Sequence, residues 1–304
     1  MIIAKEVDNI VRKGHHAQVN CVLIWQDGRL LSQNYYNRFT PESRNVIRSI
    51  AKSIVSLGIG IALEEGLIHS LDDPIGRYIP EFSQNRDWKH KLITIRHLLT
   101  MNSGIFWNGG IHYHCPMMTQ LKLSNDWIDY IADCAVKNMP GSVHNYSEWD
   151  MILATQILQN VTKDAYDYIN QNLYLPLGIK SDRWYQSPCG VYYSVALDEE
   201  LEKSSNLTGL ELLQIGILAL QNGIWNGKRI VSDEYMREAV RPSPQDKGYG
   251  YFWWIGDGWY GCKGYGGQSI TVFPEKKKVI VTQATPTARG MSYDDVIREC
   301  DGLS

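Results

Sequence analysis

The chain has 304 residues, of which 44% are hydrophobic and 21% are charged, and its formal net charge is −3. This composition is that of a globular protein with an ample core, and the absence of a basic excess argues against a nucleic-acid partner. No apolar run reaches the roughly 18 residues of a membrane span, and the six cysteines are scattered without a CxxC pair, as is typical of free thiols in a reducing compartment.

The N-terminal segment is expected to form a β-hairpin. Its first residues lack the basic and then apolar segments of a secretion signal, which predicts a cytoplasmic protein. A periplasmic or extracellular protein whose leader was removed is the alternative. Residues 19–25 form a β-rich run, residues 26–28 read Gln-Asp-Gly, and residues 30–36 form a second run. A turn at Asp27-Gly28 between two such runs predicts the hairpin.

A helix is expected over residues 49–65, ended by Gly66. From Ile54 to Leu63 it carries no charge, which predicts that it is buried. The middle of the chain has helical periodicity interrupted by Pro and Gly, for example at 95–101 and 149–159. A clear helix follows at 209–221, and strands are expected near 249–255, 266–273 and 278–283.

This order predicts an α/β (α+β) fold in which both ends of the chain form one antiparallel sheet flanked by helices. We expect residues 1–65 and 190–304 to form the sheet domain, and residues 66–189 to form an inserted all-helical domain. His112, His114 and Cys115 are close enough in sequence to suggest a metal site, but they lack a second pair of ligands. No metal or cofactor is therefore expected.

Ser49-Ile50-Ala51-Lys52 forms an S-x-x-K motif at the start of the buried helix. Residues three apart are neighbours on a helix, so Lys52 lies one turn from Ser49 on the same face. Burial lowers a lysine pKa, which predicts a neutral Lys52 that can act as a base. The alternative is a serine that caps the helix, followed by a lysine that extends to solvent. The motif alone leaves both interpretations open.

Two further segments could complete a site. Residues 140–147 form a Pro-Gly turn followed by a polar stretch with Tyr146, and a tyrosine beside a Ser/Lys pair can shuttle a proton. Residues 261–268 contain four glycines, which allow a backbone to approach a ligand and donate an N–H to an oxyanion. Taken alone, Tyr146 could simply be a packing residue and the glycines a turn without a ligand.

In these segments the sequence resembles the serine β-lactamase-like, penicillin-binding superfamily, in its branch of class C β-lactamases, D-Ala-D-Ala peptidases, esterases and 6-aminohexanoate-oligomer hydrolases. The resemblance extends from about residue 22 to residue 283. Its landmarks occur in the family's order at 49–53, 62–66, 71–74, 78–82, 95–104, 140–147, 176–179 and 225–232.

The resemblance implies that Ser49 is an acylated nucleophile, Lys52 its base partner, and Tyr146 the tyrosine of the Y-x-N or Y-x-S motif. It also places the turn at Gly264 and Tyr265 at the position of the family's K-T-G strand. The oxyanion hole would then consist of the backbone N–H groups of Ser49 and Tyr265.

Two departures from the family pattern concern substrate binding. Glu148 stands where the usual Asn is expected, and Cys262-Lys263-Gly264 replaces K-T-G. Glu148, Lys263, Gly264 and Gly266 are the candidate substrate-binding residues, although Lys263 is displaced by one residue and should point to the opposite face of a strand. The loss of K-T-G argues against substrates held by a carboxylate.

We therefore expect a hydrolase of small-molecule esters, amides or peptides, with esters or small amides preferred. A D-Ala-D-Ala peptidase or β-lactamase with the same site is one alternative. A non-catalytic binding protein of the same fold is the other.

Overall fold

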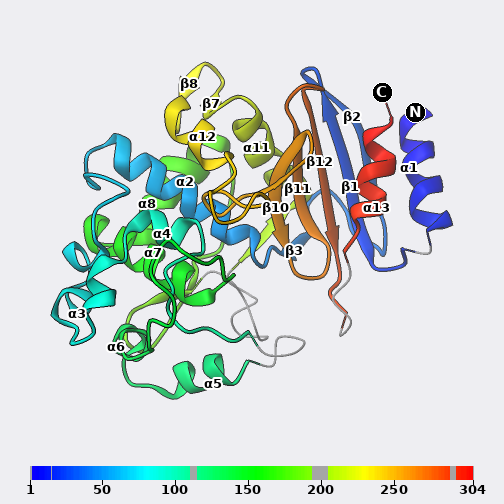
Figure 1. The fold of residues 1–304 in the computed structure, drawn as a ribbon. Coiled ribbons are helices and arrows are strands. Elements are labelled where there is room, and N and C mark those ends of the chain that lie inside the picture. Colours follow the sequence, from blue (N-terminus) through cyan, green and yellow to red (C-terminus); the bar gives the residue numbers. More distant parts are fainter. Residues whose placement is uncertain (1, 15, 110–114, 194–204, 288–291, 304) are drawn as a thin grey trace.

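The computed structural model describes residues 2–14, 16–109, 115–193, 205–287 and 292–303. A six-stranded sheet crosses the molecule in the order β2-β1-β12-β11-β10-β9, and every pairing within it is antiparallel (Figure 1). Its strands are β1 (Val19–Gln26), β2 (Arg29–Tyr35), β9 (Trp254–Gly256), β10 (Trp259–Gly264), β11 (Gln268–Phe273) and β12 (Lys278–Ala284). Because β1 pairs with β12, both ends of the chain build one sheet, which confirms the predicted fold class.

The local sequence explains where these strands turn and end. Asp27 and Gly28 have φ angles of 48° and 82°, the left-handed pair that a two-residue hairpin turn requires. The strand predicted at 249–255 is wrong in its first part, since only Trp254–Gly256 pairs with β10. Phe252 has φ 62°, and its N–H donates to the carbonyl of Leu99, so the chain joins the sheet only after this residue.

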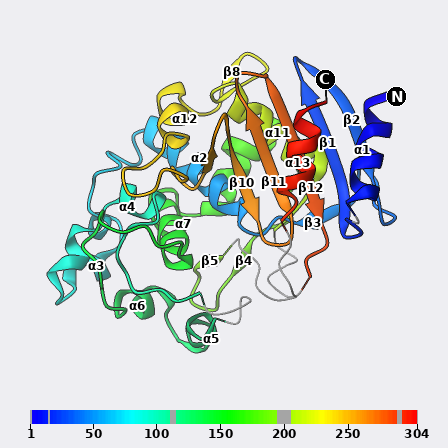
Figure 2. The same ribbon diagram turned by 45° about the vertical axis from the view of Figure 1, so that its right-hand side comes forward.

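Helices cover both faces of the sheet. On one face α1 (Ile2–Lys13) and α13 (Asp294–Asp301) lie side by side, and Val7 and Val296 pack there with Val22 and Ile280 (Figures 1 and 2). On the other face α11 (Gly209–Leu220) packs against β11 and β12. Neither α1 nor α13 was expected from the sequence, whereas α11 lies where a helix was predicted.

The buried helix α2 (Ile50–Glu64) lies between the sheet and the remaining helices. Its residues from Ile50 to Ala62 are buried, as its uncharged sequence predicts. Gly66 follows with φ 74° and ends it at the expected place. Gly60 allows the ring of Tyr235 to approach closely, because a Cβ there would lie 2.5 Å from that ring.

Helices, most of them short, make up the middle of the chain, where helices were predicted at 95–101 and 149–159. They are η1 (Ile75–Arg77), α3 (Pro80–Gln84), η2 (Trp88–Leu92), α4 (Ile95–Leu99), α5 (Pro116–Leu123), α6 (Trp127–Ala132), α7 (Glu148–Thr162), α8 (Ala165–Ile169), η3 (Asn170–Tyr174) and α9 (Leu175–Leu177), with α12 (Asp233–Ala239) later in the chain. Two-stranded pairs join β4 (Tyr185–Gln186) to β5 (Tyr192–Tyr193) and β7 (Ile224–Trp225) to β8 (Lys228–Arg229). The division into a sheet domain and an inserted helical domain stays a prediction.

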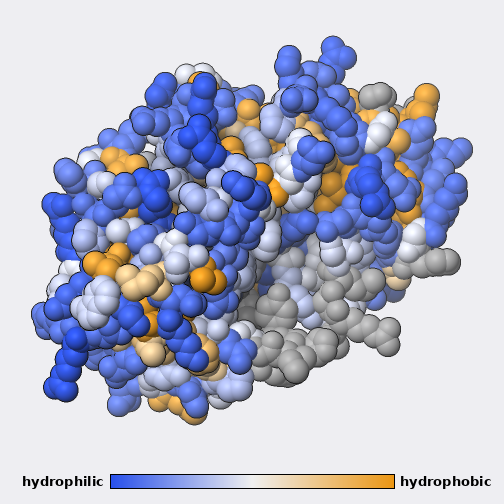
Figure 3. Space-filling view, viewed as in Figure 1, coloured by the Kyte–Doolittle hydropathy of each residue, from blue (hydrophilic) through white to orange (hydrophobic). Residues whose placement is uncertain are grey.

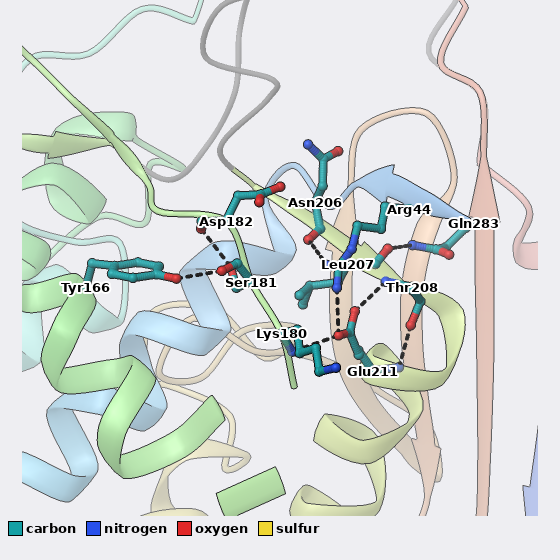
Figure 4. A network of polar contacts seen from close by, with 10 residues as sticks. All are labelled: Arg44, Tyr166, Lys180, Ser181, Asp182, Asn206, Leu207, Thr208, Glu211 and Gln283. Carbon is teal, nitrogen blue, oxygen red and sulfur yellow. Dashed lines mark hydrogen bonds and ion pairs between the residues drawn. The ribbon is translucent and has the colours of Figure 1, made fainter. Parts of the chain in front are cut away.

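A polar network around Glu211 holds the segment that precedes Ser49 (Figure 4). Glu211 accepts hydrogen bonds from the Arg44 guanidinium at 3.0 Å, from the Lys180 N–H at 2.8 Å and from the Thr208 N–H at 2.8 Å. Arg44 begins β3 (Arg44–Val46), which pairs with β6 (Asn206–Thr208). The start of α2 is therefore anchored to α11 through charge-assisted hydrogen bonds.

Polar residues predominate on the face of the molecule shown in Figure 3, where apolar side chains form small separate patches. Within the described ranges, no helix combines the length and the apolar character needed to cross a bilayer.

Candidate active site

Ser49 stands immediately before α2 and is half-buried. It occupies the N-cap position, but its side chain caps no backbone N–H of the helix. The preceding residue, Arg48, has a left-handed backbone with φ 53°, which is uncommon for a residue with a side chain. The interpretation of Ser49 as a simple helix cap is therefore wrong, and its hydroxyl is left to interact with other groups.

Lys52 lies one turn further along α2 and is only 1% exposed. Its Nζ donates to Ser49 Oγ at 3.3 Å and to Glu148 Oε1 at 2.7 Å. The alternative of a lysine that extends to solvent is excluded, because the whole side chain is buried between α2 and α7.

The charge state of Lys52 differs from the expectation. Burial lowers its pKa, but the Glu148 carboxylate, followed by Tyr146, acts in the opposite direction and outweighs burial. The pKa of Lys52 therefore lies above its ordinary value, and the prediction of a neutral lysine is wrong. Burial disfavours an ammonium only where no counter-charge is buried with it.

Tyr146 reaches the same two groups from the loop before α7. The Lys52 Nζ lies 4.8 Å from the centre of the Tyr146 ring, and the Tyr146 phenol interacts with both Ser49 and Lys52. Burial raises the pKa of this phenol, and the Lys52 charge opposes that effect without cancelling it. The ring stacks on Trp254, with centroids 5.7 Å apart, so the hydroxyl is held in place.

Glu148 lies behind Lys52 and is 6% exposed. It is the first residue of α7, where the Ser147 hydroxyl accepts from the Trp149 N–H at 3.0 Å and caps the helix. One carboxylate oxygen binds Lys52, and the other accepts from the Tyr193 hydroxyl at 3.3 Å. The structure therefore places Glu148 on protein groups, and the expectation that it contacts substrate is corrected. The carboxylate lies there because Glu148 is the first residue of α7.

Tyr193 is a site residue that the sequence did not indicate. It belongs to β5, 45 residues after Glu148, and it is fully buried. No motif surrounds it, so only its contact with Glu148 brings it to attention.

Strand β10 carries the segment that replaces K-T-G. Cys262 is fully buried and interacts with Ser53 of α2. The next side chain, Lys263, points to the opposite face of the sheet, where Nζ pairs with Asp294 of α13 at 2.8 Å and lies 4.9 Å from the Trp259 ring. The strand alternation predicted for Lys263 is confirmed, and for that reason its assignment to the substrate site is wrong.

The glycines after Lys263 allow close contacts of the backbone. A Cβ on Gly264 would lie 2.4 Å from the carbonyl oxygen of Ile47, so β10 ends directly beside the segment that leads into Ser49. A Cβ on Gly266 would lie 2.7 Å from Pro286, and the Tyr265 hydroxyl donates to the carbonyl of Thr287 at 2.7 Å. The N–H groups of Ser49 and Tyr265 as oxyanion donors, and substrate contacts at Gly264 and Gly266, stay predictions.

Comparison with known proteins places this arrangement in a family. The model of the Beta-lactamase family matches residues 7–296. The chain belongs to the Beta-lactamase family. In this family member Ser49 directly precedes the buried helix that carries Lys52, and the Lys52 Nζ lies over the Tyr146 ring; the catalytic roles of the three residues stay predictions.

Several relatives of this Beta-lactamase family member are known. Protein flp from Staphylococcus aureus (strain MW2) is 26% identical over 196 residues, which cover 60% of this chain and 39% of that protein. The chain thus matches about two fifths of the length of that relative. The structure of EstCE1, described as a hydrolase with promiscuous acyltransferase activity, superimposes with a TM-score of 0.75 at 18% identity, covering 98% and 97% of the two chains. A penicillin binding protein from Bacillus halodurans gives a TM-score of 0.75 at 16% identity, covering 98% and 100%.

Metal ligands do not gather in the part of this Beta-lactamase family chain that the structure describes, where no group of three His, Cys, Asp or Glu side chains could hold an ion. Of the three residues considered from the sequence, His112 and His114 lie outside the described residues. The thiol of Cys115 donates to the carbonyl of Asn108 at 3.0 Å. All six cysteines are free thiols.

Proposed function

We propose that the chain is a serine hydrolase that cleaves esters or small amides through an acyl-enzyme on Ser49. The observation that carries this proposal is the convergence of three groups. The Lys52 ammonium lies 3.3 Å from Ser49 Oγ, and Tyr146 contacts both. A hydroxyl held between a buried cation and a phenol is in a suitable environment for a nucleophile.

Acylation begins when Ser49 Oγ attacks the substrate carbonyl carbon. The Ser49 proton passes to the Tyr146 oxygen while the Tyr146 proton passes to the leaving alcohol or amine, so that the phenol is neutral before and after the step. The C–O or C–N bond to the leaving group breaks, and the acyl group remains on Ser49. Lys52 stabilises the partial negative charges that develop on the Ser49 and Tyr146 oxygens.

Hydrolysis of the acyl-enzyme follows the same route in reverse. A water molecule attacks the acyl carbon and gives its proton to Tyr146, while the bond from the acyl carbon to Ser49 Oγ breaks, the Tyr146 proton returns to Ser49 Oγ and the carboxylic acid leaves. The backbone N–H groups of Ser49 and Tyr265 are proposed to hold the carbonyl oxygen in both steps. The proximity of Gly264 to Ile47 supports this arrangement, because it brings the end of β10 next to Ser49.

Neutral acyl groups are the proposed substrate class. On the face of β10 that packs on α2, the residue at the K-T-G position is the thiol-bearing Cys262, while the Lys263 ammonium binds Asp294 on the other face. The aromatic side chains of Tyr146, Tyr249 and Trp254 pack together beside Ser49 and favour apolar substituents.

The test compares the wild-type protein with Ser49→Ala on p-nitrophenyl esters, together with intact-mass analysis after treatment with a fluorophosphonate. We expect hydrolysis and a single mass adduct in the wild-type protein, and neither in Ser49→Ala. Ser70→Ala, which alters a half-buried surface turn, is a matched control that should retain both. A Ser49→Ala variant with full activity would rule out the proposal. A wild-type protein without an adduct would point to a non-catalytic binding protein.

A β-lactamase or D-Ala-D-Ala peptidase is the second candidate. It is favoured by the family match and by the likeness to the penicillin binding protein from Bacillus halodurans. Incubation with a fluorescent penicillin distinguishes the two. Covalent labelling of Ser49 would support this candidate, whereas esterase activity without labelling would support the first.

A further inference from the structure

Glu148 gives the site a buried counter-charge, and this has consequences for the route of the proton. We propose that Glu148, held by Tyr193, is a positioning residue that keeps Lys52 a permanent ammonium, so that the Ser49 proton leaves through Tyr146 and never resides on Lys52. This inference rests on the function proposed above, because it concerns how the same site removes the proton of Ser49.

The geometry of the pair indicates an ionised salt bridge. Lys52 Nζ and Glu148 Oε1 are 2.7 Å apart, the distance of a charge-assisted hydrogen bond, and the two side chains are 1% and 8% exposed. Removing one partner from a buried ion pair leaves an uncompensated charge, which is far more costly than burying the pair. A neutral amide at position 148, which the family resemblance leads one to expect, could not compensate the ammonium in this way.

The second oxygen of Glu148 is also engaged. Tyr193 donates to Oε2 at 3.3 Å, so both oxygens have partners and the carboxylate is fixed in orientation. The titratable groups that act on the pair directly are Tyr146, Tyr193 and Tyr249, and around these phenols lie Cys262, Asp150 and Arg48. Burial raises the pKa of the Tyr193 and Tyr249 phenols well above the usual range, and that of the Cys262 thiol to about 12, so these groups are neutral near pH 7.

A proton relay that uses Lys52 as a base would require the ammonium to lose a proton beside a carboxylate. The structure offers Tyr146 instead, because its hydroxyl contacts both Ser49 and Lys52. In this arrangement Lys52 acts by its charge alone, and activity requires that it stay protonated.

The pH dependence of the reaction of Ser49 with an electrophile tests the inference. The rate of fluorophosphonate labelling is measured between pH 6 and pH 10 in the wild-type protein, in Glu148→Gln and in Glu148→Asp. In the wild-type protein we expect no decline up to pH 10. In Glu148→Gln the rate should fall at high pH with a midpoint below the ordinary lysine value of about 10.4, because the ammonium has lost its counter-charge. Glu148→Asp retains the carboxylate and should show no such decline, even if its rate is lower.

Two results would overturn the inference. In the first, the Glu148→Gln rate rises with pH and exceeds that of the wild-type protein near pH 7, as expected if a neutral lysine is the base. In the second, Glu148→Gln loses the same fraction of its rate at every pH, as expected if Glu148 only maintains the fold.

A double-mutant cycle of thermal unfolding tests the ion pair without relying on catalysis. Lys52→Met/Glu148→Gln removes both charges and should melt at a higher temperature than Glu148→Gln alone. If Glu148→Gln does not fold at all, a double variant that does fold gives the same answer. A buried ion pair would be contradicted if the double variant melted no higher than Glu148→Gln, or if its loss in melting temperature equalled the sum of the losses in the two single variants. Failure of the wild-type protein to be labelled at Ser49 would instead reject the proposed function, and the cycle would still report on the pair.

Discussion

Gly264 at the end of β10 packs directly on the main chain of Ile47, two residues before Ser49. A Cβ on Gly264 would lie 2.4 Å from the Ile47 carbonyl oxygen and 3.0 Å from the Arg48 Cβ. This contact sets the distance between the start of α2 and the turn at Tyr265, which bear the two proposed oxyanion donors.

Substitution Gly264→Ala should therefore affect both stability and catalysis. The added methyl group forces β10 away from Ile47, which should cost about 1–3 kcal/mol of unfolding free energy and slow acylation of Ser49 on the order of tenfold or more. Chemical denaturation and fluorophosphonate labelling measure the two effects. Gly302→Ala is the control, because the nearest atom to its Cβ is the Glu299 carbonyl oxygen at 3.4 Å. Full labelling activity in Gly264→Ala would contradict the proposed placement of the oxyanion hole.

Tyr146→Phe removes the hydroxyl but keeps the ring that stacks on Trp254. We expect acylation of Ser49 to slow about 100-fold or more because the proton route is lost, whereas the melting temperature should change little. Tyr130→Phe is a matched control, since its hydroxyl donates to the side chain of Gln120 on an exposed part of the surface. A Tyr146→Phe variant that is acylated at the wild-type rate would show that the proton takes another path.

Lys263→Met tests the corrected position of this lysine on the outer face of the sheet. Its ammonium pairs with Asp294, so the substitution should leave ester hydrolysis within about twofold of wild type and alter stability by less than about 1 kcal/mol. Lys52→Met, measured alongside, should abolish most of the activity. If Lys263→Met specifically reduces kcat/KM for esters with a carboxylate, Lys263 reaches the substrate after all.

Asp150 should make the protein less stable as the pH rises. Burial raises the pKa of this carboxyl to about 8 from an ordinary value of 3.8, although hydrogen bonds from Ser103 act in the opposite direction. The folded state therefore keeps a proton that the unfolded state loses, so this contribution to stability is complete below about pH 4 and is lost as the pH rises through 8.

Asp150→Asn resembles the protonated acid and cannot titrate. We expect its unfolding free energy to vary less between pH 5 and pH 8 than that of the wild-type protein, and to exceed it at pH 8 by at least about 1 kcal/mol. Urea denaturation across this range provides the measurement, with the exposed Asp257→Asn as the control. A slope equal to that of the wild-type protein would show that Asp150 is ionised in the fold.

Much of the architecture could be predicted because local sequence determines it. The Asp27-Gly28 turn, the uncharged run of α2 and Gly66 each act through their immediate neighbours, and the predicted elements there agree with the structure. The long strand expected at 249–255 failed for a tertiary reason, since the Phe252 N–H bonds to Leu99 in a distant segment.

The sequence by itself determined that Lys52 lies on a buried helix, one turn after Ser49, because the helical repeat and the lack of charge require it. It also determined that Lys263 and Cys262 face opposite ways, because side chains alternate along a strand. Only the tertiary structure decided that Lys52 is charged. The charge of Lys52 depends on Glu148 and Tyr193, which lie 96 and 141 residues away from Lys52 in sequence but are buried beside it. Burial alone predicts a neutral amine, and the sign of the effect reverses once a carboxylate is buried 2.7 Å away.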